Sequence, residues 1–259
     1  MSEILSQQRV LFGPGVRFEV SAVMKSLGCS NALILATYEQ TAVAQEVFDS
    51  LGGSSIGVYA KAEMHTPIEV TRAALKYLNE NKADCLVSIG GGSTTGLGKA
   101  LSFRKGLPHI VLPTTYAGSE ATPILGETDN GIKTTFSDKT ILPDVVLYDP
   151  ELVVSLPKNM TATSGLNAMA HAIEALYARD RTDMTTEIAI AGLTDLTEAL
   201  PKVLVSPGDI VAREQTLRGA WACGTVLGSV GMALHHKLCH TLGGSFSMAH
   251  AQTHAVLLP

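Results

Sequence analysis

The sequence contains few charged residues and no run of basic ones. Charged residues make up 17% of the 259 positions, and the formal net charge is −5. Nucleic-acid-binding proteins usually carry a basic patch or stripe, so this balance argues against a nucleic-acid partner. No apolar run reaches the roughly 20 residues that cross a bilayer, and no signal-peptide pattern opens the sequence. We therefore expect a cytoplasmic protein without a nucleic-acid or membrane partner.

Cysteine is also scarce, and no two of the four cysteines have the C-x-x-C spacing. Each cysteine stands among apolar residues. This pattern is typical of buried free thiols in a reducing compartment. The expected free thiols are Cys29, Cys85, Cys223 and Cys239.

Apolar runs of strand length alternate with helical periodicity through the first part of the sequence. The expected strands cover residues 10–12, 31–36, 55–59, 84–89, 109–112 and 141–147, and the expected helices cover 38–51, 66–81 and 93–103. This alternation predicts a parallel sheet with helices on both faces. Asn130-Gly131 predicts a tight turn between two further strands. Thr66-Pro67-Ile68-Glu69 predicts a helix start, with a capping threonine, a proline at the first helical position and a capping-box glutamate.

After Pro157 the sequence shows helical periodicity alone. The expected helices cover residues 161–178, 183–200, 209–227 and 231–242. We expect breaks between them at Pro201, Pro207-Gly208 and Gly243-Gly244. The sequence thus predicts an α/β domain over residues 1–155 and an all-helical domain over residues 156–259.

A glycine-rich loop, Gly90-Gly91-Gly92-Ser93, joins an expected strand to an expected helix. Glycines let the backbone approach a phosphate closely, and the helix N-terminus offers free N–H groups. The loop is neither the G-x-G-x-x-G nor the Walker pattern. Thr114 and Thr115 add hydroxyls after the next strand, at the same sheet edge. We expect a pyrophosphate here, and a simple tight turn is the alternative.

The residue after the first full strand often decides which nicotinamide cofactor binds. A carboxylate at this position grips the ribose 2′-hydroxyl and repels a 2′-phosphate. The sequence has Thr37 there, so NADH and NADPH are both expected to bind. The alternative is that Thr37 is only a loop residue.

Five of the eight histidines fall between positions 235 and 254. His236 and His240 are four residues apart, as are His250 and His254, so each pair shares one face of a helix. Asn167 and His171 repeat the spacing upstream. Such pairs can build a pocket for a metal or an anion, although chance packing of histidines is the alternative.

Several of these segments together resemble the iron-containing (group III) alcohol dehydrogenase superfamily. The matching segments are residues 12–17, 88–99, 112–120, 126–128, 165–174 and 235–246. The resemblance covers the whole sequence. It implies an α/β NAD(P)-binding domain with a parallel sheet, an all-α C-terminal domain and an active site between them. The sequence ends in an apolar run without a helix stop, and the resemblance likewise implies further helices beyond Pro259.

The resemblance also implies roles for the histidines. In metal-dependent relatives an aspartate and three histidines hold the ion, and these positions match Asn167, His171, His236 and His250. The family's catalytic-pocket histidine matches His240. Two departures stand out, because Asn167 replaces the carboxylate ligand and Gly96 replaces the aspartate that usually follows the glycine loop. An amide is a weaker ligand than a carboxylate, so we expect that no metal is required.

The activity implied is that of an NADH- or NADPH-dependent reductase. Its substrate is a small dicarboxylate with a carbon–carbon double bond conjugated to a ketone, formed in the breakdown of aromatic compounds. The expected catalytic residues are His240 and His236, and the expected substrate-binding residues are Asn167, His171, His250, Tyr116 and Lys237. The expected cofactor-binding residues are Thr37, Gly90, Gly91, Gly92, Ser93, Thr94, Thr114, Thr115 and Lys133. A core-packing role is an equal alternative for Tyr116.

We expect a homodimer. Two other functions stay open at this point. One is a metal-dependent alcohol dehydrogenase of the same fold, and the other is a metal-binding relative that has lost catalysis.

Overall fold

The computed structural model describes residues 8–246, 248 and 250–258, and at residues 240, 243–245 and 250 it describes the backbone alone. The described chain forms two compact units. The α/β unit comprises residues 8–114 and 123–149, and the helical unit comprises residues 115–122 and 150–258. The chain therefore enters the helical unit briefly after residue 114, returns, and enters it again after residue 149.

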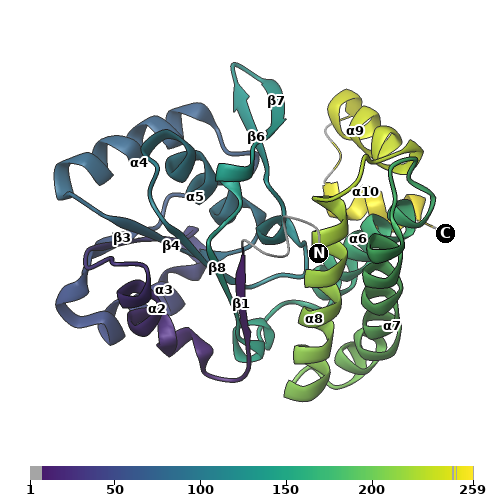
Figure 1. Ribbon diagram of the computed structural model, residues 1–259, viewed down its shortest axis with the longest axis horizontal. Coiled ribbons are helices and arrows are strands. Elements are labelled where there is room, and N and C mark those ends of the chain that lie inside the picture. Colours follow the sequence, from purple (N-terminus) through teal and green to yellow (C-terminus); the bar gives the residue numbers. More distant parts are fainter. Residues whose placement is uncertain (1–7, 247, 249, 259) are drawn as a thin grey trace. The chain divides into compact units, whose positions relative to one another are not determined.

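A six-stranded parallel sheet forms the centre of the α/β unit, in the order β1-β8-β5-β4-β2-β3 (Figure 1). The strands are β1 (Arg9–Phe12), β2 (Ala32–Leu35), β3 (Ser55–Tyr59), β4 (Cys85–Gly90), β5 (His109–Pro113) and β8 (Val145–Tyr148). Every residue of β2, β4, β5 and β8 is buried. Continuous burial is characteristic of parallel strands that helices cover on both faces, so the predicted fold is confirmed.

The helices of this unit are α2 (Val20–Ser26), α3 (Thr41–Leu51), α4 (Ile68–Asn81) and α5 (Gly92–Lys105). Leu78 of α4 and Leu101 of α5 pack with Leu33 and Leu86 of the sheet in one apolar cluster. The connection from β2 to β3 runs across the sheet in the direction opposite to those from β3 to β4 and from β4 to β5. Since such crossovers are right-handed, α3 covers the face opposite to α4 and α5 (Figure 1).

A separate antiparallel hairpin, β6 (Ile124–Asp129) and β7 (Ile132–Ser137), packs on α5 through Leu125 and Ala100. Its turn residues, Asn130 and Gly131, have φ values of 48° and 78°. Positive φ at both turn positions is what a type I′ hairpin requires. The predicted turn is confirmed.

The predicted start of α4 is wrong in detail. The helix begins at Ile68, after Pro67, and no side chain caps it. Thr66 has a φ of 48°, and its carbonyl accepts a hydrogen bond from Thr128 N at 3.2 Å. Thr66 therefore serves the junction with β6 instead of capping a helix, a long-range contact that the local pattern does not reveal.

The predicted strand at 141–147 is also too long. Residues Lys139–Ile141 form a 3-10 turn, in which Asp138 Oδ1 accepts from Thr140 N at 2.8 Å. Pro143 follows and has no N–H group for a sheet. The strand begins only at Val145.

The helical unit consists of α6 (Lys158–Tyr177), α7 (Asp183–Val205), α8 (Ile210–Leu227), α9 (Leu234–Phe246) and α10 (His250–Leu257). Glycines bring α7 and α8 close together, since a Cβ at Gly192 would lie 3.1 Å from Gly219 O. Thr182 caps α7 and Asp209 caps α8. The all-helical prediction is confirmed. The remaining short 3-10 helices are η1 (Val16–Glu19), η2 (Tyr38–Gln40), η3 (Gly52–Ser54), η4 (Ser119–Ala121) and η6 (Pro150–Val153).

Two of the predicted helix breaks are wrong. Pro201 lies inside α7, where it has no N–H group to donate to the carbonyl of Thr197, four residues earlier. Gly243-Gly244 lies inside α9, which runs to Phe246. A glycine in a helix costs about 1 kcal/mol relative to alanine, so tertiary packing can outweigh it. Among the described residues, none of the helices combines the length and hydropathy needed to cross a bilayer.

The segment 115–122 packs on α8 within the helical unit. Gly118 has a φ of 76°, and a Cβ there would lie 3.0 Å from Gly224 Cα. The buried Arg213 of α8 donates to Tyr116 Oη at 2.9 Å and to Val154 O at 3.3 Å. The two glycines allow the backbones to meet, and the arginine holds the segment in place.

Candidate active site

The glycine loop spans the end of β4 and the start of α5. Gly90 has a φ of 152°, and a Cβ there would overlap the Thr94 hydroxyl. Gly91 is the N-cap residue of α5, and no side chain caps the helix. Gly92 is exposed, with open space around the position of a Cβ. The free N–H groups and the open approach are what a phosphate group needs.

Other predicted cofactor residues lie at the same carboxyl edge of the sheet. Thr114 N donates to Gly90 O at 3.1 Å, which places Thr114 directly beside the loop. Thr37 lies two residues after Leu35, the last residue of β2, and is half-buried. Thr94 is buried, and its Oγ1 has no hydrogen-bond partner within the described part of the chain. The structure thus brings Thr37, the loop and Thr114 to the edge where such sheets bind ligands.

Two further predicted cofactor residues are Thr115 and Lys133. Thr115 belongs to the segment that packs in the helical unit. Lys133 lies on the exposed strand β7, opposite Thr128. Their roles in cofactor binding stay predictions.

Gly96, one of the two departures noted in the sequence, has a local explanation. It faces Thr66, and a Cβ at position 96 would overlap the Thr66 hydroxyl. Thr66 is buried in its positive-φ conformation. The threonine therefore occupies the space that an aspartate side chain at position 96 would need.

The histidine cluster lies within the helical unit. Asn167 and His171 come from α6, and His236 comes from α9. Asn167 Nδ2 lies 3.2 Å from His171 Nε2, and His171 Nδ1 lies 2.9 Å from His236 Nε2. All three side chains are buried. The two rings stack with their centroids 5.0 Å apart.

Glu174 continues this series and is a residue that the sequence reasoning missed. Its carboxylate makes a short hydrogen bond with His236 Nδ1 and accepts from His235 N at 2.7 Å. Burial raises the pKa of Glu174, but the hydrogen bond and charge of His236 and the bond from His235 outweigh it and lower the pKa. An ionised Glu174 favours a proton on His236 Nδ1. When the His236 ring is neutral, its Nε2 therefore accepts from His171.

A sequence signal for Glu174 existed. Asn167, His171 and Glu174 have the spacing i, i+4, i+7, which places all three on one face of α6. Glu174 is not one of the family's ligand positions, so it was not among the predicted site residues, although it lies one turn further along the same face.

A second missed group adjoins the first. His235 Nε2 lies 3.0 Å from His254 Nδ1, and Cys239 Sγ lies 3.7 Å from His235 Nε2. The His254 ring also stands edge-on to the His236 ring, with centroids 4.6 Å apart. Of the predicted pair His250 and His254, it is therefore His254 that the structure places beside this series. The predicted substrate-binding residue was His250.

Of the remaining predicted residues, the structure describes the side chains of only some. The side chains of His240 and His250 lie outside the part that the structure describes. Lys237 is exposed on α9. Tyr116 is fully buried and accepts the hydrogen bond from Arg213, which favours the core-packing alternative. Burial raises the pKa of the Tyr116 phenol, although Arg213 opposes this.

The cysteine prediction is confirmed, since Cys29, Cys85, Cys223 and Cys239 are free and buried. Burial raises the pKa of each thiol, to about 12 for Cys223.

The described donors at the family's metal positions lack an anionic ligand for a divalent ion. The described donors are the Asn167 amide and the His171 and His236 imidazoles, none of which carries a negative charge when the rings are neutral. Both nitrogens of His171 face neighbouring side chains within the cluster. Glu174 reaches His236 at Nδ1, the nitrogen opposite to the one that faces His171. Among the described donor atoms of Asn167, His171 and His236, only Asn167 Oδ1 is buried without a hydrogen-bond partner.

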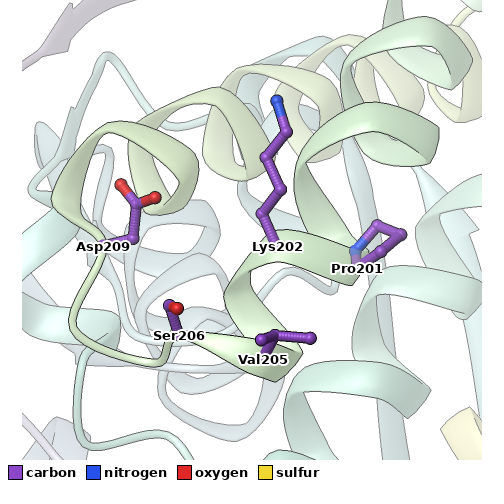
Figure 2. A pocket seen from close by; sticks show the side chains of 5 residues that line it. All are labelled: Pro201, Lys202, Val205, Ser206 and Asp209. Carbon is purple, nitrogen blue, oxygen red and sulfur yellow. The ribbon is translucent and has the colours of Figure 1, made fainter.

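A surface hollow of about 400 Å³ lies where α7 ends and α8 begins (Figure 2). It is lined by Pro201, Lys202, Val205, Ser206 and Asp209. The Asp209 carboxylate accepts from Ala212 N at 3.0 Å and so caps α8. The one acidic group of this hollow is therefore structural.

Residues 7–150 match the family described as iron-containing alcohol dehydrogenase, and residues 161–259 match the C-terminal part of the Fe-containing alcohol dehydrogenase family. The chain belongs to the iron-containing alcohol dehydrogenase family.

Within this family its relatives include maleylacetate reductases. The chain is 57% identical to the maleylacetate reductase of Rhizobium sp. (strain MTP-10005) over 97% of its own length and 72% of the relative's. Identity to the enzyme of Burkholderia cepacia is 51%, over 97% and 71%. The crystal structure of maleylacetate reductase from Agrobacterium tumefaciens has a TM-score of 0.95 at 56% identity, over 97% and 72% of the two chains.

Proposed function

We propose that this protein reduces maleylacetate to 3-oxoadipate with NADH or NADPH. The observation that carries the proposal is the 57% identity to a maleylacetate reductase over 97% of the chain. The reaction belongs to the degradation of aromatic compounds.

The glycine loop and the N-terminus of α5 fit the pyrophosphate of the cofactor. Gly90, Gly91 and Gly92 leave the N–H groups accessible, and Ser93, Thr94 and Thr114 add hydroxyls around them. Thr37 at the end of β2 brings no carboxylate against a 2′-phosphate, so both cofactors are accepted. When bound, the nicotinamide supplies a hydride.

The side chains of the protein must stabilise a negative charge on the substrate and then deliver a proton to it. Hydride addition at the carbon β to the ketone leaves an enolate, whose oxygen must be stabilised before its α carbon takes a proton. A positioned imidazole can donate the hydrogen bond and supply the proton. We assign this role to His240, with His236 as the second candidate.

The hydrogen-bonded series from Asn167 to Glu174 supports a reaction without a metal. Each ring nitrogen of His171 and His236 has a protein neighbour, and the set lacks the carboxylate ligand of metal-dependent relatives. Asn167, His171, His250 and Lys237 can instead bind the two carboxylates of the substrate. An anionic substrate favours protonation of the imidazoles, and crowding of the rings limits this to about one proton.

Metal removal tests the proposal directly. With maleylacetate, oxidation of NADH and NADPH is expected to persist after treatment with EDTA, whereas simple alcohols are expected to be poor substrates. Asn167→Asp should bind a divalent ion more tightly and maleylacetate more weakly, because it adds a negative charge to the cluster. If EDTA abolishes activity and zinc, iron or manganese restores it, the protein is a metal-dependent dehydrogenase, as its family name suggests.

We also propose a homodimer, which sedimentation equilibrium of the purified protein tests.

A further inference from the structure

A histidine, a cysteine and a second histidine converge from two helices beside the series described above. His235 and Cys239 are four residues apart on α9, and His254 lies on α10. Their ligand atoms all lie within 4.8 Å of one another. Cys239 and His254 are buried, whereas His235 is half-buried. The group therefore has a buried side and a side from which an ion can enter.

The spacing of the three ligand atoms suits a tetrahedral zinc ion. With zinc about 2.0–2.1 Å from nitrogen and about 2.3 Å from sulfur, tetrahedral angles require about 3.3 Å between nitrogens and about 3.6 Å between nitrogen and sulfur. The observed separations are 3.0 Å for His235 Nε2 to His254 Nδ1 and 3.7 Å for His235 Nε2 to Cys239 Sγ. The ligand atoms of Cys239 and His254 also lie within 4.8 Å of each other.

We infer that His235, Cys239 and His254 form a binding site for Zn²⁺, with three protein ligands and a fourth position open to water. None of these residues belongs to the set Asn167, His171, His236 and His250 that matches the family's metal ligands. A thiolate and two imidazoles are also ligands that zinc prefers.

Binding exchanges one ion for one proton. The Cys239 thiol loses its proton to solvent and binds as the thiolate. Burial, and next the charge of Glu174, raise the pKa of Cys239, so the thiol is protonated without the ion. One of the two facing imidazole nitrogens carries a proton, which moves to the other nitrogen of its ring when the metal binds.

Glu174 supports such a site from outside it. Its carboxylate accepts from the backbone N–H of His235 at 2.7 Å and so fixes the start of α9. Its negative charge acts on Cys239 and favours a cation there. Carboxylates in this position commonly tune metal affinity.

The α/β unit contains another group with suitable ligand types, formed by Cys29, Asp84 and Cys85. The Asp84 oxygens already accept from Ser30 N at 2.9 Å and Asn31 N at 2.8 Å. The Asp84 carboxylate therefore already stabilises the loop before β2. This group provides the matched control for the experiment.

Titration of the metal-depleted protein with Co²⁺ tests the inference, because cobalt bound to a thiolate gives a near-ultraviolet charge-transfer band. One Co²⁺ per chain should bind with this band, and Zn²⁺ should displace it. Cys239→Ser should abolish the band and weaken Zn²⁺ binding at least about a hundredfold, since even residues outside the ligand set change metal affinity ten- to a hundredfold. Cys85→Ser should change neither.

Three results would overturn the inference. The first is Zn²⁺ binding no tighter than about 10 μM, far weaker than zinc sites in proteins. The second is cobalt binding without the thiolate band, which would mean that Cys239 is not a ligand. The third is a band that survives in Cys239→Ser and vanishes in Cys85→Ser. Should Cys239→Ser misfold, His235→Gln at a half-buried position replaces it and should weaken Zn²⁺ binding to the same extent. All readouts are binding measurements, so they are independent of the proposed reaction.

Discussion

The protonation of a histidine in this protein depends on the neighbours that form hydrogen bonds with it. His236 can act as a donor or acceptor only if its proton stays on a defined nitrogen. Glu174 holds the proton on Nδ1 through its hydrogen bond to that nitrogen. The same carboxylate accepts from the backbone of His235. A residue that touches no substrate therefore sets the protonation pattern of the whole histidine series.

Glu174→Gln tests this positioning role. The amide can donate to His236 Nδ1 and so favours the other tautomer, and we expect turnover to fall on the order of a hundredfold with little change in the Michaelis constant for cofactor. Steady-state kinetics with maleylacetate measure both. A loss of cofactor affinity with normal turnover would mean that Glu174 has only a structural role.

The same variant has a predicted pH signature in stability. The pKa of Glu174 is lowered from its ordinary value of 4.5 in the folded protein, so the unfolded chain takes up the proton first as pH falls. The carboxylate therefore stabilises the fold above pH 4.5, and this contribution is lost as pH falls through the lower folded pKa. Urea unfolding should show the largest difference between the two proteins near neutral pH and a shrinking difference below 4.5.

Thr37 determines cofactor choice in our proposal. Thr37→Asp should shift preference toward NADH, because the new carboxylate repels the 2′-phosphate of NADPH. The ratio of kcat/KM for the two cofactors measures the shift. Thr41→Asp, an equal change of charge at an exposed position of α3, is the control. Equal effects of both variants would show that Thr37 does not face the ribose.

At the scale of elements, substitutions at two glycines of the loop should have different effects, one on cofactor binding and the other on stability. Gly92 has open space around it, whereas Gly90 has positive φ and contacts Thr94. Gly92→Val should therefore fold normally and raise the Michaelis constant for cofactor at least tenfold, by blocking the approach of the pyrophosphate. Gly90→Ala should lower the melting temperature, since a Cβ is strained there. An unchanged Michaelis constant in Gly92→Val would remove the loop from the cofactor site.

Sequence periodicity predicted most elements because burial and secondary structure repeat locally. The continuous apolar run of β2 and the Asn130-Gly131 turn are examples. Periodicity failed where a contact with a residue distant in the sequence determines the local structure. Thr66 looks like a cap but pairs with β6. The spacing within α6 places Glu174 on the face of Asn167 and His171, but it does not show that His235 and His236 of α9 pack against Glu174 and His254.

At the scale of the whole molecule, Arg213 joins parts of the helical unit that lie far apart in the sequence. It is buried and donates to Tyr116, Thr161, Val154 and Pro207. Arg213→Met should destabilise the protein by about 3 kcal/mol, because it leaves several buried acceptors without their donor. Tyr116→Phe should cost only about 1 kcal/mol and leave the Michaelis constant for maleylacetate unchanged. Thermal unfolding and kinetics measure the two effects, and a raised Michaelis constant in Tyr116→Phe would return Tyr116 to the substrate site.

The excursion of residues 115–122 into the helical unit limits how the chain can be dissected. A single cut after residue 149 would leave this segment on a fragment without α8, so the apolar surface around Tyr116 and Gly118 would be exposed to water. The other fragment would keep Arg213 without its phenol acceptor. Neither half is therefore a natural unit for separate expression, and a protease that nicks the chain at this junction would yield fragments that stay associated until denatured.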